Sequence, residues 1–166
     1  MAQVTSLGAN DSGSTSRSTI NNNFTNLNNQ VQIIYKSADE TVNNSSTLQN
    51  DDHLVLAVSA NEVWAIRFVA LYNSGTTPDI KFAFTLPSGA TIQFIDDSLD
   101  GGAVTNAGVA INSSGQGASN AMFVSSAIAF ISNTPGNVQL QWAQATADPS
   151  DTKVLKGSYI IAHKLA

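Results

Sequence analysis

The hydrophobic pattern of the chain changes its period once, and this change limits the folds that the chain can adopt. The first part carries a thin apolar stripe at intervals of four, three, four and three residues, which is the a/d pattern of a short coiled coil. The members of this stripe are Ile20, Phe24, Leu27, Val31 and Ile34. From Tyr35 onward apolar and polar residues alternate, as they do in half-buried strands. We therefore predict an all-β domain that follows one short, amphipathic, coiled-coil-like helix.

The part before the change of period is predicted to contain an arm and the helix. Residues 1–13 are small and polar, and we expect an extended arm that becomes ordered against a partner. The helix is expected over residues 14–34, with Ser14 or Ser16 as its N-cap. Its many Asn residues are poor helix formers, so contacts with other elements or chains must stabilise it. The predicted division is an arm and an attachment or oligomerisation helix over residues 1–34, and a β-sandwich domain over residues 35–166.

Seven stretches of the second part have the composition of strands, and turn signals rich in Gly, Pro, Asn and Asp separate them. One of them, Val63 to Tyr72, is apolar on both faces and is predicted to be a central strand. The stretches are residues 54–59, 63–72, 80–86, 90–95, 121–131, 138–145 and 154–163. Seven or eight short strands without a second helix indicate a jelly-roll-like β-sandwich, with an up-and-down barrel as the alternative. We expect the glycine-rich loop Asp100–Gly117 at a subunit contact or an exposed tip.

The charge of the chain argues against nucleic acid as a partner. The net charge is −5, and the seven basic residues are scattered along the sequence, whereas nucleic-acid backbones need clustered Lys and Arg. There is no cysteine, so neither a disulfide framework nor a thiolate metal site is expected. The first residues lack the basic and apolar regions of a signal peptide, and no apolar stretch is long enough to span a bilayer. We therefore expect a soluble chain without a membrane partner.

Catalytic chemistry has few candidates in this sequence. Only His53 and His163 could act as bases near neutral pH, and neither lies in a motif for nucleophilic catalysis. His53 is interpreted as a solvated turn residue, and His163 lies near the end of the last predicted strand. We predict that the protein is not an enzyme and that it uses no cofactor.

One acidic segment has the spacing of a metal site at its start. Asp96, Ser98 and Asp100, followed by glycine, match the opening of a calcium loop. The twelfth position is Ala107, where a bidentate Glu is needed, and no helix is predicted on either side. A solvated acidic turn is therefore the preferred interpretation, and no metal site is predicted.

Aromatic residues on the outside of a β-sandwich can stack on sugars. The candidates for such contacts are Trp64, Trp142, Tyr72 and Tyr159. Both Trp residues lie in alternating apolar series, so we expect them in the core.

Two sets of residues carry a resemblance to known proteins. In the N-terminal part they are Asp11-Ser12-Gly13 through Arg17, Ile20-Asn21-Asn22-Asn23-Phe24 and Leu27. In the head they are Leu48-Gln49-Asn50-Asp51-Asp52, Ile80-Lys81-Phe82-Ala83-Phe84, Pro87-Ser88-Gly89-Ala90-Thr91 and Gly157-Ser158-Tyr159. The first set is similar to an N-terminal motif of tail-fibre and other virion proteins of tailed bacteriophages, where it looks like a virion-attachment helix. The second set resembles a β-domain of phage structural proteins.

This resemblance implies a non-enzymatic structural protein of a phage virion, made in the cytoplasm of a bacterial host. The chain has neither a long repetitive shaft nor a distal tip domain, which favours a capsid decoration (cement) protein or a short head fibre. The resemblance further implies a homotrimer on the capsid exterior, with the major capsid protein as its partner. The alternative is a tail-fibre or adhesin component that binds tail proteins, a host receptor or a surface glycan.

The heptad positions of the stripe also favour a trimer. Phe24 and Val31 fall at a, while the other three members fall at d, and this mixed core differs from the β-branched a and Leu d of two-stranded coiled coils. Arg17 falls at the preceding a position, where its charge would fray the seam or meet an anionic partner. The predicted attachment and oligomerisation residues are Arg17, Ile20, Phe24, Leu27, Val31 and Ile34. Because the stripe spans fewer than three heptads, a helix that lies on its own or a neighbouring sandwich remains open.

Overall fold

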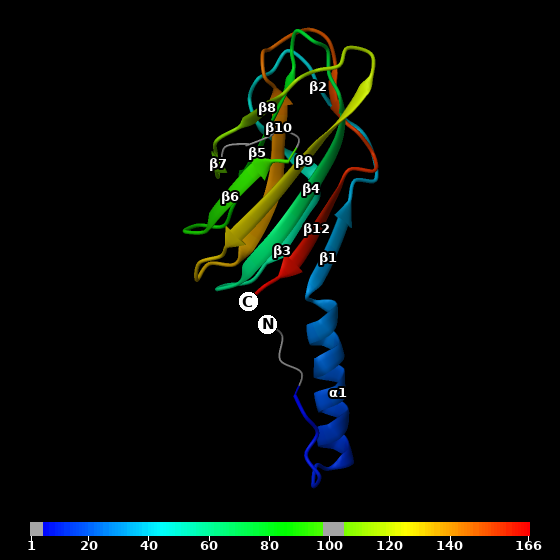
Figure 1. Ribbon diagram of the computed structural model, residues 1–166, viewed down its shortest axis with the longest axis vertical. Coiled ribbons are helices and arrows are strands. Elements are labelled where there is room, and N and C mark those ends of the chain that lie inside the picture. Colours follow the sequence, from blue (N-terminus) through cyan, green and yellow to red (C-terminus); the bar gives the residue numbers. More distant parts are fainter. Residues whose placement is uncertain (1–4, 98–104) are drawn as a thin grey trace.

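The computed structural model of the protein describes residues 5–97 and 105–166. This part of the chain has one helix, α1 (Gly13–Asn28), and twelve strands in two antiparallel sheets (Figure 1). The strands are β1 (Val31–Tyr35), β2 (Glu40–Val42), β3 (Gln49–Val58), β4 (Val63–Asn73), β5 (Ile80–Thr85), β6 (Thr91–Asp96), β7 (Thr105–Asn106), β8 (Ile111–Ser113), β9 (Asn120–Phe130), β10 (Gly136–Gln144), β11 (Thr152–Val154) and β12 (Tyr159–Lys164).

The two sheets form a jelly-roll-like β-sandwich, as predicted. The eight-stranded sheet has the order β1-β12-β4-β9-β6-β7, and β11 joins β4 to β2 beside it. The four-stranded sheet has the order β3-β10-β5-β8. The alternative of an up-and-down barrel is wrong, because sequence neighbours such as β3 and β4 lie in different sheets. The prediction of a central strand is confirmed, since β4 pairs with β9 along its whole length and with β12 and β11 on its other side.

Aromatic side chains from both sheets fill the space between them. The ring of Phe84 on β5 lies 4.1 Å from Phe68 on β4 and 4.7 Å from Phe94 on β6, measured between ring centroids. Phe82 stacks on Phe123 of β9 at 4.4 Å. These rings are buried because the inward side chains of each strand alternate with outward ones, so that the two inner faces interdigitate.

The helix is shorter than predicted and begins earlier. Ser12 is the N-cap, and its Oγ accepts a hydrogen bond from the Thr15 amide, so the prediction of Ser14 or Ser16 is wrong. The helix ends at Asn28, so the prediction of a helix through Ile34 is also wrong. β-branched residues of β1 prefer a strand, and pairing with β12, from Val31 opposite His163 to Tyr35 opposite Tyr159, satisfies their backbone groups.

Three other predicted segments differ from the structure. The strand expected over residues 54–59 is β3, which begins at Gln49 and ends at Val58. The single strand expected over residues 154–163 is two strands, β11 and β12, because the chain turns between them at Gly157, whose φ of +92° favours glycine. The loop expected over residues 100–117 contains β7, which pairs with β6, and β8, which pairs with β5. The part of this loop before residue 105 lies outside the described residues.

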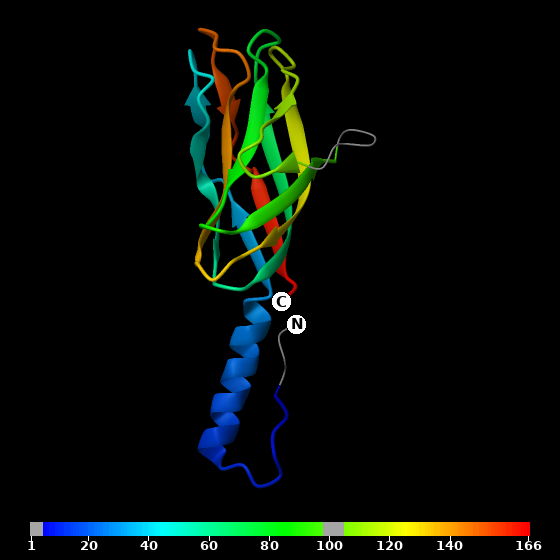
Figure 2. The same ribbon diagram turned by 90° about the vertical axis from the view of Figure 1, so that its left-hand side faces the viewer.

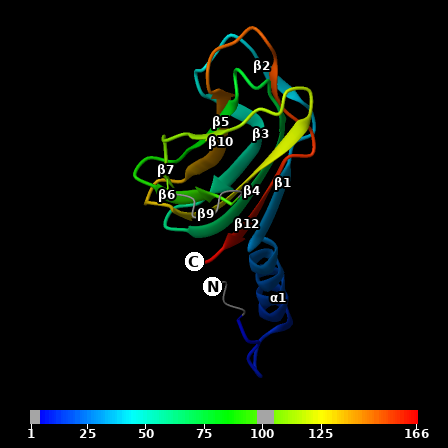
Figure 3. The same cartoon turned by 45° about the horizontal axis from the view of Figure 1, so that its top comes forward.

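Helix α1 projects from one end of the head, where it contacts β1 (Figures 1, 2 and 3). The described part of the arm, from residue 5 onward, folds back along the helix (Figure 2). The amide of Thr5 donates to Asn23 Oδ1, and Asn23 Nδ2 donates to the Thr5 carbonyl, both at 3.0 Å. The arm therefore has a partner within its own chain. Among the described residues, no helix is long and apolar enough to cross a membrane.

Candidate assembly surface

The apolar stripe of α1 is exposed in the single chain. Phe24 is 63% exposed, and Ile20 and Leu27 are also exposed. Arg17, which lies one turn before Ile20, is exposed as well. A helix in a globular protein normally buries such a stripe against a core. Here the helix lies beyond the head, so the stripe is available to another chain.

The exposed apolar residues continue onto the edge strand β1. Val31, Ile33 and Tyr35 point outward, and Ile33 and Tyr35 are 70% and 65% exposed. Ile34 points the other way and packs against the core. Four of the predicted stripe residues are thus exposed, whereas Ile34 is not, because the strand period of two replaces the helical spacing after Asn28.

The outer face of the eight-stranded sheet extends this surface across β12, β4, β9 and β6. Cross-strand partners in antiparallel pairs lie on the same face, so the register of the sheet defines three rows that start on β1. The rows are Val31–His163–Ala65–Ile128–Gln93, Ile33–Ile161–Arg67–Ser126–Ile95 and Tyr35–Tyr159–Val69–Val124. We call this set, with the exposed Met122 and Phe130 on β9, the outer sheet face. It is mostly apolar.

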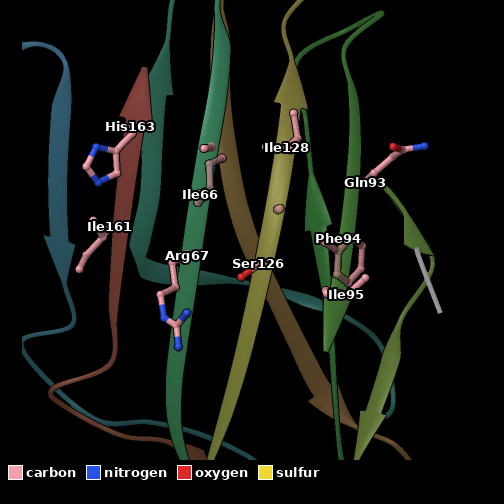
Figure 4. A pocket seen from close by; sticks show the side chains of 11 residues that line it. Ile66, Arg67, Gln93, Phe94, Ile95, Ser126, Ile128, Ile161 and His163 are labelled. Carbon is pink, nitrogen blue, oxygen red and sulfur yellow. The ribbon is translucent and has the colours of Figure 1, made fainter. Parts of the chain in front are cut away.

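A shallow groove of about 650 Å³ crosses the outer sheet face (Figure 4). Its lining includes Ile161 and His163 from β12, Arg67 from β4 and Ile128 from β9. The guanidinium of Arg67 lies 3.6 Å from Asp97 Oδ2, which also accepts a 2.6 Å hydrogen bond from Ser126 Oγ. The positive charge in the groove therefore has a partner in the same chain.

A buried polar cluster connects the edge of this sheet to the four-stranded sheet. Lys36, which follows β1, is buried, and its Nζ lies 2.7 Å from Asp51 Oδ2 on β3 and 3.0 Å from Glu40 Oε2 on β2. Asp51 Oδ1 accepts hydrogen bonds from the amides of His53 and Leu54. The cluster holds the end of β1 against β3, and it therefore fixes the strand that carries the exposed apolar residues.

The same cluster offers ligand atoms to a cation, but its chemistry favours the lysine. Glu40, Asp51 and His53 bring one ligand atom each to within 4.8 Å of one another. The ammonium of Lys36 already pairs with both carboxylates, so a divalent ion would have to displace a buried positive charge. Burial raises the pKa of Glu40 and the nearby Asp51 adds to this, against the hydrogen bonds from Lys36 and the Asp52 amide.

The two histidines lie in different sheets. His53 is on β3 and His163 is exposed on β12. The interpretation of His53 as a solvated turn residue is wrong, since its ring is half-buried with Nδ1 3.7 Å from Glu40 Oε1. Asp51 and Asp52, which precede His53, also lie within β3, where Asp51 is buried and Asp52 is exposed.

The acidic segment is only partly described. Asp96 is buried at the end of β6, so the interpretation as a solvated acidic turn is wrong for this residue. Asp97 is an exposed turn residue, and its Oδ2 accepts a hydrogen bond from Ser126 Oγ. Ser98 and Asp100 lie outside the described residues, and the predicted calcium-like opening is not complete within the structure.

The aromatic candidates for sugar stacking are mostly internal. Trp64 and Trp142 are buried, as expected, and their Nε1 atoms donate to Glu62 and Glu40 respectively. Tyr72 is also buried, and its hydroxyl donates to the Ser114 carbonyl. Tyr159 is half-buried on the outer sheet face, opposite the exposed Tyr35.

Comparison with protein-family models and with curated proteins gives no match. Among solved structures, Eiger TNF from S. frugiperda is 13% identical with a TM-score of 0.47, over 82% of this chain and 92% of that one. The tripod from the baseplate of bacteriophage Tuc2009 is 12% identical with a TM-score of 0.33, over 98% and 99%. VP2 of the infectious bursal disease virus subviral particle is 10% identical with a TM-score of 0.31, over 81% and 39%. At these values the likenesses do not by themselves assign a function to the chain.

Sequence reasoning missed Ile33, Tyr35 and Ile161 as members of the exposed surface. The alternation of Val31, Ile33 and Tyr35 was the signal that could have found them. This alternation could not be distinguished from a helical pattern, because Val31 and Ile34 also continue the helical spacing of the stripe. A short apolar run fits both periods.

Proposed function

We propose that this chain is a non-enzymatic structural protein of a tailed-phage virion. In this proposal α1 and the arm attach a trimeric β-sandwich to the particle, with the capsid exterior as the site and the major capsid protein as the partner. The chain then acts as a capsid decoration protein or a short head fibre, without a cofactor or a metal.

The observation that carries the proposal is the exposed stripe on a helix that projects from the head. The residues of this helix are mostly Ser, Thr and Asn, and an isolated helix of this length and composition is marginal in water. Contacts with other chains would bury Ile20, Phe24 and Leu27 and stabilise it. The resemblance of the same residues to a phage attachment motif supports a particle as the place where this happens.

The proposed site on the capsid implies a mechanical role. Apolar contacts between chains contribute about 25 cal/mol for each Å² of apolar surface that they bury. Copies that each bridge neighbouring capsid proteins would add this contribution many times over a shell. The shell would then resist the pressure of the packaged DNA better than the undecorated shell does.

The attachment role can be tested with particles that lack this protein. Purified full-length chain is mixed with them and co-sedimented. The variant Phe24→Ser with Leu27→Ser is expected to bind at least tenfold more weakly, because it removes the stripe. The control is Asn22→Ser with Asn26→Ser, two exposed positions on the opposite side of the helix, which should bind like the natural chain. Equal binding of both double variants would contradict the proposal.

An adhesin is the second candidate, and the exposed Tyr35 beside Tyr159 favours it. Tyrosine rings at the surface of a sandwich can stack on a sugar. The same preparations are therefore incubated with host cells. Binding to cells that the stripe variant retains and Tyr35→Ala loses would support the adhesin, whereas binding to the particle alone supports decoration.

A further inference from the structure

We infer that the outer sheet face is the contact surface between copies of this chain, which pack around an axis along α1 and β1. This inference rests on the trimer of the proposed function, but it assigns the main contact to the sheet and not to the helix alone. The occupant of the groove in Figure 4 is then the β1 edge of a neighbouring copy, because a trimer around one axis brings two different patches of each chain into contact.

The two outer faces of the sandwich differ in chemistry. The outer side of the four-stranded sheet carries polar side chains, among them Asn50 and Gln141, which pair across β3 and β10, and Asn137. Such a polar face can be exposed to solvent without a partner. The outer sheet face instead exposes Ile33, Met122 and other large apolar residues. Large exposed apolar patches mark interaction sites in soluble proteins, so the partner is expected on this side.

The charge of the outer sheet face fits a second copy of the chain. The chain has a net charge of −5, so surfaces that carry the excess acidic residues would repel an identical surface. On this face Arg67 is paired with Asp97 of the same chain at 3.6 Å, which leaves little net charge. Identical neutral apolar surfaces can pack without a charge penalty, whereas a strongly charged partner would find nothing to pair with.

The edge of the sheet also indicates a contact with a neighbouring copy. Strand β1 is at the end of the strand order, so one side of its backbone has no strand partner within the described sheet. Natural proteins protect edge strands with charges, prolines or covering elements. The outward residues of β1 are Val31, Ile33 and Tyr35, which offer no such protection. A neighbouring copy packed at this edge would supply the cover.

The size of the surface also agrees with a stable contact. One side of a typical stable protein interface contains roughly 20–30 residues. The exposed and half-buried members of the three rows, with Met122, Phe130 and the stripe residues Ile20, Phe24 and Leu27, number 17, which is close to the lower end of this range. Because α1 leads into β1 with only two residues between them, one axis could bring the stripe and the sheet edge of each copy together.

The test is the mass of the full-length chain in solution by sedimentation equilibrium. The natural chain is expected at three times its 17.4 kDa. Ile33→Glu, which places a charge on the outer sheet face, is expected at the mass of one chain. Ala57→Glu is the matched control, because Ala57 is exposed on the outer side of the four-stranded sheet. It should keep the mass of the natural chain.

Circular dichroism checks that each variant is folded, and Met122→Glu on β9 replaces Ile33→Glu if that variant does not fold. A natural chain with the mass of one copy, or glutamate variants that keep the mass of three, would overturn the inference. A single-copy mass together with normal attachment to particles would overturn this inference and the trimer, but would keep the attachment role of the proposed function. A three-copy mass without attachment would support this inference and contradict the proposed function.

Discussion

At the scale of residues, two ion pairs, one buried and one partly exposed, explain how a chain with few charges positions its strands. Lys36 joins β1 to β3 through Asp51, and Lys164 at the end of β12 reaches Glu62 at 2.7 Å. Buried charges are tolerated when each has a partner and hydrogen bonds. Both pairs lie at strands that support the outer sheet face, so they stabilise the arrangement of that surface.

Lys36→Met is expected to lower the free energy of unfolding by about 3–5 kcal/mol, because it leaves Asp51 buried without its positive partner. Lys153→Met is the control, since Lys153 and Asp151 form an exposed pair and such a pair contributes at most about 1 kcal/mol. Urea unfolding at one protein concentration measures both. Adding Asp51→Asn to Lys36→Met should recover part of the loss. Equal effects of Lys36→Met and Lys153→Met would show that the buried pair is not important.

The lowered pKa of Glu62 predicts that the stability of the fold depends on pH. Burial opposes ionisation of Glu62, but hydrogen bonds from Lys164, the Ser59 amide and Trp64 Nε1 outweigh it and lower the pKa below 4.5. Because the pKa is lower in the folded chain, the stabilisation is complete above the unfolded value and is lost as pH falls through the folded value.

Glu62→Gln is therefore expected to be less stable than the natural chain by about 2 kcal/mol at pH 7. The difference should shrink as the pH falls below 4.5. Urea midpoints between pH 7 and pH 3 measure it. A difference that stays constant over this range would mean that ionised Glu62 does not stabilise the fold.

At the scale of elements, the sequence was most informative where one period dominates. The strands β5 and β10 alternate, and β4 and β9 carry long apolar runs, and all four were predicted to within a few residues of their bounds. The end of α1 was not predicted correctly, because Val31 and Ile34 fit both the helical and the strand period. Only pairing with β12, which is distant in sequence, decides between them. The short strands β2, β7 and β8 depend on such distant partners too, so no local signal identifies them.

One glycine shows how closely two loops approach each other. A Cβ at Gly115 would collide with the carbonyl of Gly75, and the Gly115 amide donates to Asp79 Oδ1 at 2.7 Å. Gly115→Ala is expected to lower the free energy of unfolding by about 1–3 kcal/mol, because the backbone has to move. Gly13→Ala, at a helix position with open space around it, should be neutral or slightly stabilising. Thermal unfolding of the two variants compares them, and an unchanged melting temperature for Gly115→Ala would contradict the close packing.

At the scale of the whole molecule, the chain has a polar outer face, an apolar outer face and a projecting helix. The sandwich, the core position of both Trp residues and the exposed helical stripe could be predicted from the sequence. The outer sheet face could not, because its rows combine residues from β1, β12, β4, β9 and β6 that only the strand order brings together. This combination supports the proposal that the chain works as one of many copies in an assembly.

The copy number of this protein in purified parent particles tests that proposal most directly. Quantitative mass spectrometry compares peptides of this chain with peptides of the major capsid protein. A capsid decoration protein is expected at an abundance comparable to that of the capsid protein. A trace amount would contradict the capsid site and favour a tail position, and complete absence from the particle would contradict a structural role in the virion.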